Sequence, residues 1–146
     1  MDPMQIALDE ARAAAARDEV PVGAVVLAPD GTVLAQAGNR VEAEHDASAH
    51  AELLALRLAA ARLGTPRLVG CDLFVTLEPC PMCAAACSHF RIRRLVFGAY
   101  DAKGGGVEHG ARVFAQPSCL HRPEVVGGVR ETEAGELLRG FFSKLR

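Results

Sequence analysis

The alternation of apolar and polar positions along the chain predicts an α/β protein. Residues 4–18 form an Ala-rich run with high helix propensity. The apolar run from Val22 to Ala28 predicts a buried strand, and Pro29-Asp30-Gly31 is a typical turn before a second strand at Thr32–Ala37. These two strands are expected to form a hairpin.

Helical and strand patterns alternate through the rest of the chain. A helix is predicted from about Ala47 to Leu63, with Asp46 as its N-cap and Gly64 as its end. The further elements are a strand at 73–77, a helix at 81–90, a strand at 92–98, a candidate fifth strand at 124–129 and a helix at 132–145. Such strand–helix–strand units favour parallel strands with helices on both faces of the sheet.

Length and composition are those of a single domain, residues 1–146, large enough to bury a core. No apolar run approaches the length of a membrane span, and the charged N-terminus is unlike a signal peptide. Five cysteines, an odd number, argue against a disulfide framework and favour a reducing, cytoplasmic location.

The charges are distributed unevenly. Residues 1–90 hold 6 basic and 12 acidic side chains, whereas residues 91–146 hold 10 basic and 6 acidic ones. Such asymmetry is compatible with a nucleic acid lying across one face, and equally with an ordinary solvated surface. The net charge of −2 argues against a generic polyanion binder.

Two short motifs bear the most informative chemistry, His50-Ala51-Glu52 and Pro79-Cys80-Pro81-Met82-Cys83. They supply three metal-type ligands, His50, Cys80 and Cys83, and three protein ligands leave one tetrahedral position open, as in catalytic zinc sites. The pattern H-x-E followed by P-C-x-x-C is typical of zinc-dependent deaminases of nucleobases.

Glu52 is the candidate proton carrier. Deamination of an aromatic amidine needs a strong nucleophile, and zinc lowers the pKa of bound water from about 15.7 to roughly 7. A carboxylate beside the metal can then move protons to the ring nitrogen and to the departing amine.

The spacing of the ligands favours one site. Cys80 and Cys83 are three residues apart and share a helix face, with Pro81 suited to the first helical turn. His50 and Glu52 would point to nearly opposite sides of a helix, although side chains of a first turn can converge beyond its N-terminus. We therefore expect two helix N-termini to meet at the metal, just past the end of the third strand.

Taken alone, the C-x-x-C motif is also compatible with a redox site or half of a structural zinc site. Cys87 could share the face of Cys80 and Cys83 as a fourth ligand, but it is expected to pack in the core, as are Cys71 and Cys119. The other histidines lack partner spacing and are expected at surfaces, caps or loops: His45, His89, His109 and His121. Gly104–Gly106 is expected to form a mobile loop.

With these motifs the chain resembles the cytidine-deaminase-like superfamily and, within it, the bacterial tRNA-specific adenosine deaminases. The resemblance covers nearly the whole chain. Its most specific stretches are residues 19–25 (EVPVGAV), 38–40 (GNR), 49–52 (AHAE), 76–83 (TLEPCPMC), 91–92 (RI), 96–99 (VFGA), 101–103 (DAK) and 141–142 (FF).

This resemblance implies a three-layer α/β/α sandwich around a five-stranded mixed sheet, and a homodimer whose partner helps to build the active site. It implies conversion of the wobble adenosine of a tRNA anticodon stem-loop to inosine with release of ammonia. It assigns one Zn²⁺ per chain to His50, Cys80 and Cys83, proton transfer to Glu52, contacts with the flipped nucleoside to Asn39 and the Ala51 backbone, and contacts with the anticodon loop to Asp101, Lys103, Phe142 and Arg146.

Two other functions are compatible with the sequence. Sister families with both motifs deaminate free bases or nucleosides such as guanine or cytosine. A non-catalytic, zinc-stabilised RNA-binding module would be a third interpretation, although a structural zinc site has no need of Glu52.

Overall fold

The computed structural model describes residues 1–145 and contains a five-stranded sheet with the order β2-β1-β3-β4-β5. β1 pairs antiparallel with both β2 and β3, whereas β3, β4 and β5 are parallel to one another. The sheet is therefore mixed. The strands are β1 (Gly23–Leu27), β2 (Val33–Gly38), β3 (Asp72–Leu77), β4 (Arg94–Ala99) and β5 (Glu124–Val126).

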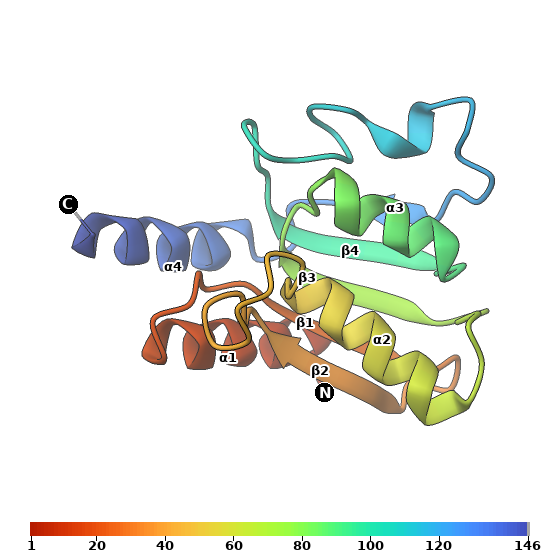
Figure 1. The fold of residues 1–146 in the computed structure, drawn as a ribbon, viewed down its shortest axis with the longest axis horizontal. Helices are drawn as coiled ribbons and strands as arrows, with labels where there is room; N and C mark the ends of the chain where they lie inside the picture. Colours follow the sequence, from red (N-terminus) through yellow and green to blue (C-terminus); the bar gives the residue numbers. More distant parts are fainter. Residues whose placement is uncertain (146) are drawn as a thin grey trace.

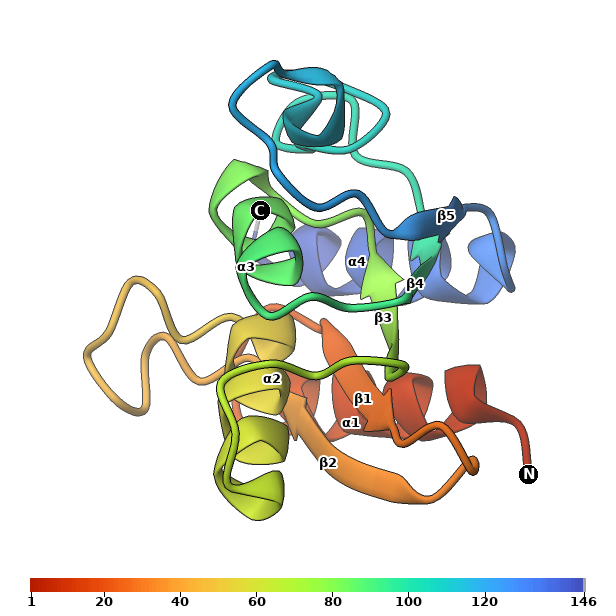
Figure 2. The ribbon, with the colours of Figure 1, turned by 90° about the vertical axis from the view of Figure 1, so that its right-hand side faces the viewer.

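Helices cover both faces of this sheet. α2 and α3 lie together on one face, and α1 and α4 lie together on the other (Figures 1 and 2). The helices are α1 (Pro3–Ala16), α2 (Ala51–Leu63), α3 (Pro81–His89) and α4 (Glu131–Lys144), with a short 3₁₀ helix, η1 (Val113–Ala115). This confirms the expected three-layer α/β/α sandwich around a mixed sheet.

Alternation along the strands divides the core in two. In β3, Leu73 and Val75 are buried against the α2 and α3 side, whereas Phe74 packs on the α1 and α4 side and Leu77, at the end of the strand, contacts both clusters. Successive strand residues point to opposite faces, so a strand covered on both sides is apolar throughout.

The chain topology brings two loops to one edge. Leu77 of β3 pairs with Ala99 of the parallel neighbour β4, so both strands end at the same edge of the sheet. The residues that follow them, Cys80 after β3 and Asp101 after β4, therefore lie beside each other. This edge is the carboxyl end of the parallel strands, where ligands bind in open α/β sheets.

The start of α2 differs from the prediction. The helix begins at Ala51, four residues after Ala47, because residues 41–45 and 47–48 form turns. The Asp46 carboxylate accepts hydrogen bonds from the Ser48 backbone N–H at 2.8 Å and hydroxyl at 2.7 Å. Asp46 thus stabilises a turn, and its assignment as the N-cap was wrong. Gly64 does end α2, in the left-handed conformation with φ 68°.

Residues 104–106 form a loop, as expected, and part of this loop packs against the start of α3. Gly105 and Gly106 are buried, and the Gly106 N–H donates to the Pro79 carbonyl at 2.8 Å. A Cβ on Gly106 would lie 2.6 Å from the Cα of Pro81. Only a glycine lets this backbone approach the start of α3 so closely.

The other boundaries shift slightly. β4 begins at Arg94, two residues after the predicted start, and β5 ends at Val126, three residues before the predicted end. No helix among residues 1–145 is both long and apolar enough to cross a membrane.

Candidate metal and substrate site

The N-termini of α2 and α3 meet at the three predicted ligands. His50 is the N-cap of α2, Cys80 is the N-cap of α3, and Cys83 lies in the first turns of α3. His50 has extended backbone angles (φ −75°, ψ 147°), so it precedes the helix that contains Glu52. Because His50 lies outside the helix, helical spacing does not force the side chains of His50 and Glu52 to opposite sides. Both residues line the same cavity.

The separations between the ligand atoms suit a tetrahedral zinc ion. His50 Nδ1 lies 3.6 Å from Cys80 Sγ and 3.5 Å from Cys83 Sγ, and the three atoms lie within 4.8 Å of one another. Zn–S and Zn–N bonds of about 2.3 and 2.05 Å at a tetrahedral angle place sulfur and nitrogen about 3.6 Å apart. Within residues 1–145, His50, Cys80 and Cys83 are the His, Cys, Asp or Glu side chains that cluster closely enough to hold a metal ion.

The electrostatics of the site favour a thiolate at Cys80. The Cys83 thiol interacts with the Cys80 sulfur and lowers the pKa of Cys80 to about 4; burial opposes this effect, and His50 adds to it. The interaction with Cys80 in turn raises the pKa of His50. Thiolates are the form in which cysteine binds metals.

Glu52 is buried beside these ligands. Its side chain is only 4% exposed, and it lines the same cavity as His50 and Cys80. Burial raises the pKa of Glu52 to about 7, although its own backbone N–H and His50 act in the opposite direction. A carboxyl group with a pKa near neutrality can both accept and donate a proton.

The other cysteines pack in the core as expected. Cys71, Cys87 and Cys119 are buried in the cluster beneath α2 and α3, and burial raises the pKa of Cys87. Cys87 is not part of the metal-ligand group.

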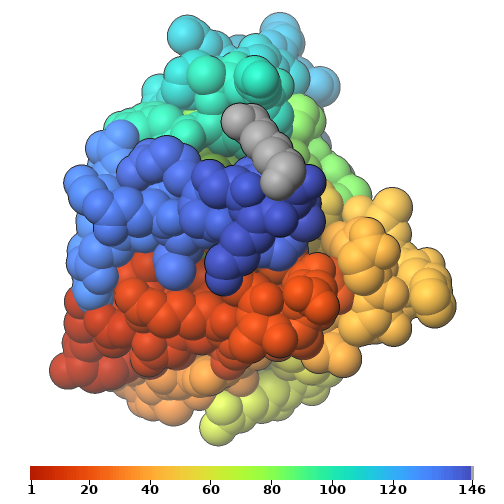
Figure 3. All heavy atoms as spheres, turned by 90° about the vertical axis from the view of Figure 1, so that its left-hand side faces the viewer, coloured from red at the N-terminus to blue at the C-terminus, as the bar shows by residue number. Residues whose placement is uncertain are grey.

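A cavity of about 590 Å³ opens beside the ligands. Its walls come from five parts of the chain: the segment after α1, the segment before α2 with the start of that helix, the turn from β3 to α3, the loop after β4 and the end of α4. In Figure 3, α4 (blue) lies between α1 (red) and the segment after β4 (green-blue), with the segment around residues 40–46 (gold) projecting at the side. The lining includes Asp18, Glu19, Val22, Asn39, Glu42, His50, Glu52, Glu78, Cys80, Asp101, Gly104, Phe141 and Phe142.

Asn39 caps α2 from a distance. The N-cap residue His50 makes no side-chain capping bond, and the Asn39 Oδ1 instead accepts from the Ala51 N–H at 2.7 Å. The carbonyl of Asn39 accepts from the Arg17 guanidinium at 3.0 Å. The Ala51 N–H is therefore engaged within the chain, and the amide nitrogen of Asn39 is the group left to meet a ligand in the cavity.

The residues expected to contact an anticodon loop surround the cavity to different degrees. Asp101 and Phe142 line it, and Phe142 is 44% exposed. Lys103 is exposed on the loop after β4, where its backbone N–H donates to the Asp101 carboxylate. Arg146 lies outside the described residues.

Two buried carboxylates in the cavity wall have roles that the sequence analysis did not assign. Glu19 accepts hydrogen bonds from the N–H groups of Glu42 (3.1 Å) and Ala43 (2.8 Å). Glu78 is 1% exposed, and one of its partners is His109 Nδ1 at 2.8 Å; the loop position of His109 was expected, but this contact was not. The sequence signal that could have identified Glu78 is an acidic residue directly after an apolar strand.

Glu78 is held in its ionised form. Burial alone would raise the pKa of Glu78, but hydrogen bonds from the Asp101 N–H, the His109 ring and the Glu108 N–H outweigh burial and hold the pKa below its usual value.

Comparisons with known proteins agree with this geometry. A family model described as the cytidine and deoxycytidylate deaminase zinc-binding region matches residues 2–99, which include all three ligands. A tRNA-specific adenosine deaminase of Agrobacterium fabrum is 55% identical over 143 residues, covering 98% of this chain and 93% of that protein. A tRNA-specific adenosine deaminase of Bacillus subtilis is 45% identical over 143 residues, covering 98% and 88%.

Solved structures give the same result. A structure from a study of A-to-I editing by tRNA:A34 deaminases has a TM-score of 0.91 and 55% identity, covering 93% of this chain and 98% of that chain. A guanine deaminase from Nitrosomonas europaea has a TM-score of 0.84 and 29% identity, covering 97% and 83%. The chain therefore belongs to the zinc-binding cytidine and deoxycytidylate deaminase family and, within it, to the tRNA-specific adenosine deaminases.

Proposed function

We propose that this chain, acting as one deaminase domain, hydrolyses the wobble adenosine of a tRNA anticodon to inosine and ammonia. The observation that carries the proposal is the placement of buried Glu52 in the same cavity as the ligands His50 and Cys80. Full-length similarity to tRNA-specific adenosine deaminases supports tRNA as the substrate. Such a substrate would place the enzyme in the cytoplasm.

The residues present fit the requirements of the reaction. Zinc held by His50, Cys80 and Cys83 would lower the pKa of a bound water to about 7 and so supply the nucleophile. The Glu52 carboxylate would take one proton from the attacking water and pass it to the ring nitrogen, and would then take the second proton from the added hydroxyl and pass it to the departing amino group. Water adds oxygen at the carbon that loses ammonia, which balances the reaction.

The walls of the cavity suit a flipped nucleoside. The Asn39 amide nitrogen can donate to the base or ribose, and His50 and Glu52, on either side of the buried Ala51, line the cavity beside it. Phe142 at the rim offers an apolar face on which a neighbouring base can stack. Lys103, exposed beside the cavity, supplies positive charge for the phosphates.

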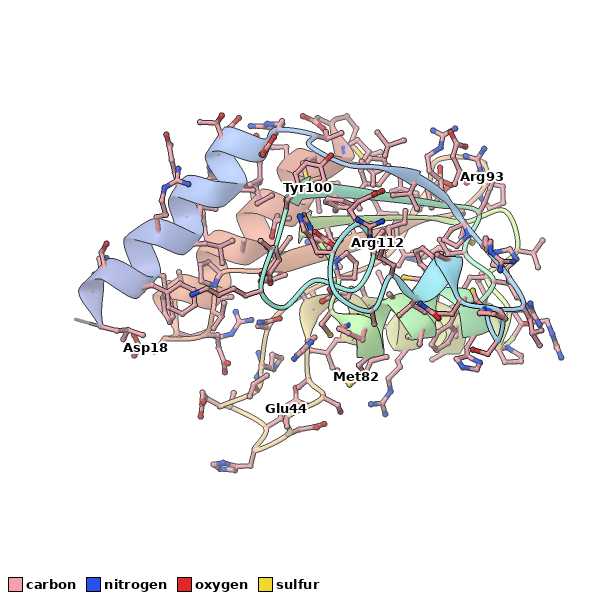
Figure 4. All side chains as sticks on the ribbon, turned by 90° about the horizontal axis from the view of Figure 1, so that it is seen from above. Asp18, Glu44, Met82, Arg93, Tyr100 and Arg112 are labelled. Atoms are coloured by element: carbon pink, nitrogen blue, oxygen red, sulfur yellow. The ribbon has the colours of Figure 1, made fainter. Side chains whose placement is uncertain are left out.

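We also propose that the protein acts as a homodimer. Met82 on α3 is 39% exposed and points away from the body of the protein (Figure 4), and Leu120 is 84% exposed. Leu120 and α3 residues line a second cavity of about 300 Å³. A partner subunit seated there would bury these apolar groups. Light scattering coupled to size exclusion would show a mass near twice 15.4 kDa if the proposal holds.

Deamination of free guanine is the second candidate function. The similarity to the N. europaea guanine deaminase over 97% of this chain favours it, because the same scaffold there accepts a free base. A non-catalytic RNA-binding module is disfavoured, because a structural zinc site would not need a buried carboxyl group such as Glu52 in the open cavity.

Inosine formation in an arginine anticodon stem-loop with a wobble adenosine tests the proposal. The zinc-loaded protein should convert that adenosine alone, whereas Glu52→Ala should convert none. A folded, zinc-bound protein that leaves the stem-loop unchanged and consumes free guanine would move the assignment to the second candidate.

A further inference from the structure

The loop between β4 and η1 is built around the side chain of Glu78. Oε2 of this buried carboxylate accepts from the backbone N–H groups of Val107 (3.2 Å), Glu108 (2.9 Å) and His109 (3.1 Å). Oε1 accepts from the Asp101 N–H at 3.0 Å and from His109 Nδ1 at 2.8 Å. One side chain thus fixes both ends of the segment from Asp101 to His109.

The five donors occupy both oxygens of a group that accepts but cannot donate when ionised. Backbone bonds join the same two segments. The Glu78 N–H donates to the Ala99 carbonyl at 2.8 Å, and the Gly106 N–H donates to the Pro79 carbonyl at 2.8 Å. The turn that presents Cys80 to the metal is therefore attached directly to the loop.

This loop forms one wall of the cavity. Asp101 and Gly104 line the cavity, and Lys103 lies exposed between them. The Asp101 carboxylate in turn accepts from the N–H groups of Lys103 (3.2 Å) and Gly104 (2.9 Å). The positions of these three residues therefore depend on the point at which Glu78 holds the Asp101 backbone.

We propose that Glu78 is a positioning residue for the substrate: it fixes the loop 101–109 as the wall of the cavity that receives the anticodon loop. The substrate named here rests on the proposed function, whereas the Glu78–loop interaction does not. Glu78 itself need not touch the substrate. It acts through Asp101 and Lys103, and it ties them to the turn that presents Cys80.

Site-resolved amide hydrogen exchange on the zinc-loaded full chain tests the interaction between Glu78 and the loop. Glu78→Gln keeps the size of the side chain but turns one acceptor oxygen into an NH₂ donor that faces N–H groups. Exchange at Val107, Glu108 and His109 should accelerate about tenfold or more, because bonds to a charged acceptor are lost. Unchanged exchange at these amides would overturn the proposal.

Glu19→Gln is the matched control. It makes the same change at Glu19, another buried carboxylate of the cavity that binds backbone N–H groups, here those of Glu42 and Ala43. Exchange at residues 42–43 should rise, and exchange at 107–109 should stay within about twofold of the wild-type rate. Equal acceleration of both loops by either variant would indicate general destabilisation and contradict the proposal.

Steady-state kinetics with the anticodon stem-loop distinguish a role of Glu78 in positioning the substrate from a role in stability alone. In Glu78→Gln, the KM for the anticodon stem-loop should rise about tenfold, with kcat within about threefold and one zinc per chain retained. A normal KM despite faster loop exchange would overturn the positioning role. Wild-type protein that does not edit the stem-loop, but shows the expected exchange pattern, would refute the proposed function and leave the Glu78–loop interaction intact.

His109→Ala covers the case in which Glu78→Gln does not fold. It removes one of the five donors and leaves the carboxylate with its four backbone partners. Loop exchange and KM should both rise by about threefold or more. If neither changed, the proposal would be overturned.

Discussion

The distant cap on α2 makes Asn39 a test of how the fold supports the site. Asn39→Ala would leave the Ala51 N–H without its 2.7 Å acceptor in a place where Ala51 is fully buried. An unsatisfied buried donor costs about 1–3 kcal/mol. A domain of this size has a total stability of about 5–15 kcal/mol, so the loss is readily measured.

Asn39→Asp is the informative companion variant. It keeps an acceptor oxygen for the Ala51 N–H, at a helix N-terminus that favours negative charge, but it removes the amide donor that faces the cavity. Asn39→Ala should therefore lose both stability and activity. Asn39→Asp should lose activity while its stability stays within about 0.5 kcal/mol of the wild type.

Urea unfolding at a fixed excess of zinc measures the difference, because zinc that binds only the folded state would otherwise shift the midpoint. The m-value should be the same in all three proteins. An Asn39→Ala protein as stable as wild type would refute the capping role. An Asn39→Asp protein as unstable as Asn39→Ala would show that the acceptor oxygen is not what matters.

Three further substitutions address the chemistry. Glu52→Ala should keep one zinc per chain by elemental analysis and lose at least about 10²-fold in kcat; a variant near wild-type activity would exclude Glu52 as the proton carrier. Cys83→Ala should lose zinc and unfold at lower urea, since bound metal contributes folding free energy, whereas Cys87→Ala should keep the metal; zinc retained by the first variant would mean the ligand set is wrong. Phe142→Ala should raise the KM for the stem-loop about fivefold or more with little change in stability, because this ring is half exposed and its proposed partner is a base; unchanged KM would place the RNA elsewhere.

The sequence predicted the layers and the ligands because both depend on local patterns. Apolar runs and alternating strands define the two-sided sheet, and the spacing of Cys80 and Cys83 together with Pro81 defines the start of α3. The helix N-termini were expected to meet at the metal, and they do meet at its three candidate ligands.

Features that depend on long-range contacts were not predictable in this way. The pairing of β1 with β2 was predicted as a hairpin, but nothing in the sequence of β1 specifies β3 as its other neighbour. The donor that Asn39 satisfies is 12 residues away, and the partners of Glu78 are 23 to 31 residues away. The error at Asp46 is of the opposite kind, because a local pattern was given too much weight. Asp is a common N-cap residue, but here its carboxylate stabilises a turn before the helix.

The two buried carboxylates that bind loop N–H groups, Glu19 and Glu78, also indicate where this scaffold can change without displacing the metal ligands. Glu19 binds the backbone of residues 42–43, and the exposed residues 44–45 follow directly after them. Glu78 binds the backbone of residues 101 and 107–109, and the exposed residues 102–104 lie between these two points. Substitutions or insertions at these tips would reshape the rim of the cavity and leave His50, Cys80 and Cys83 in place. Related proteins can therefore differ in substrate while they keep the same zinc ligands, if only the residues of these two loop tips differ.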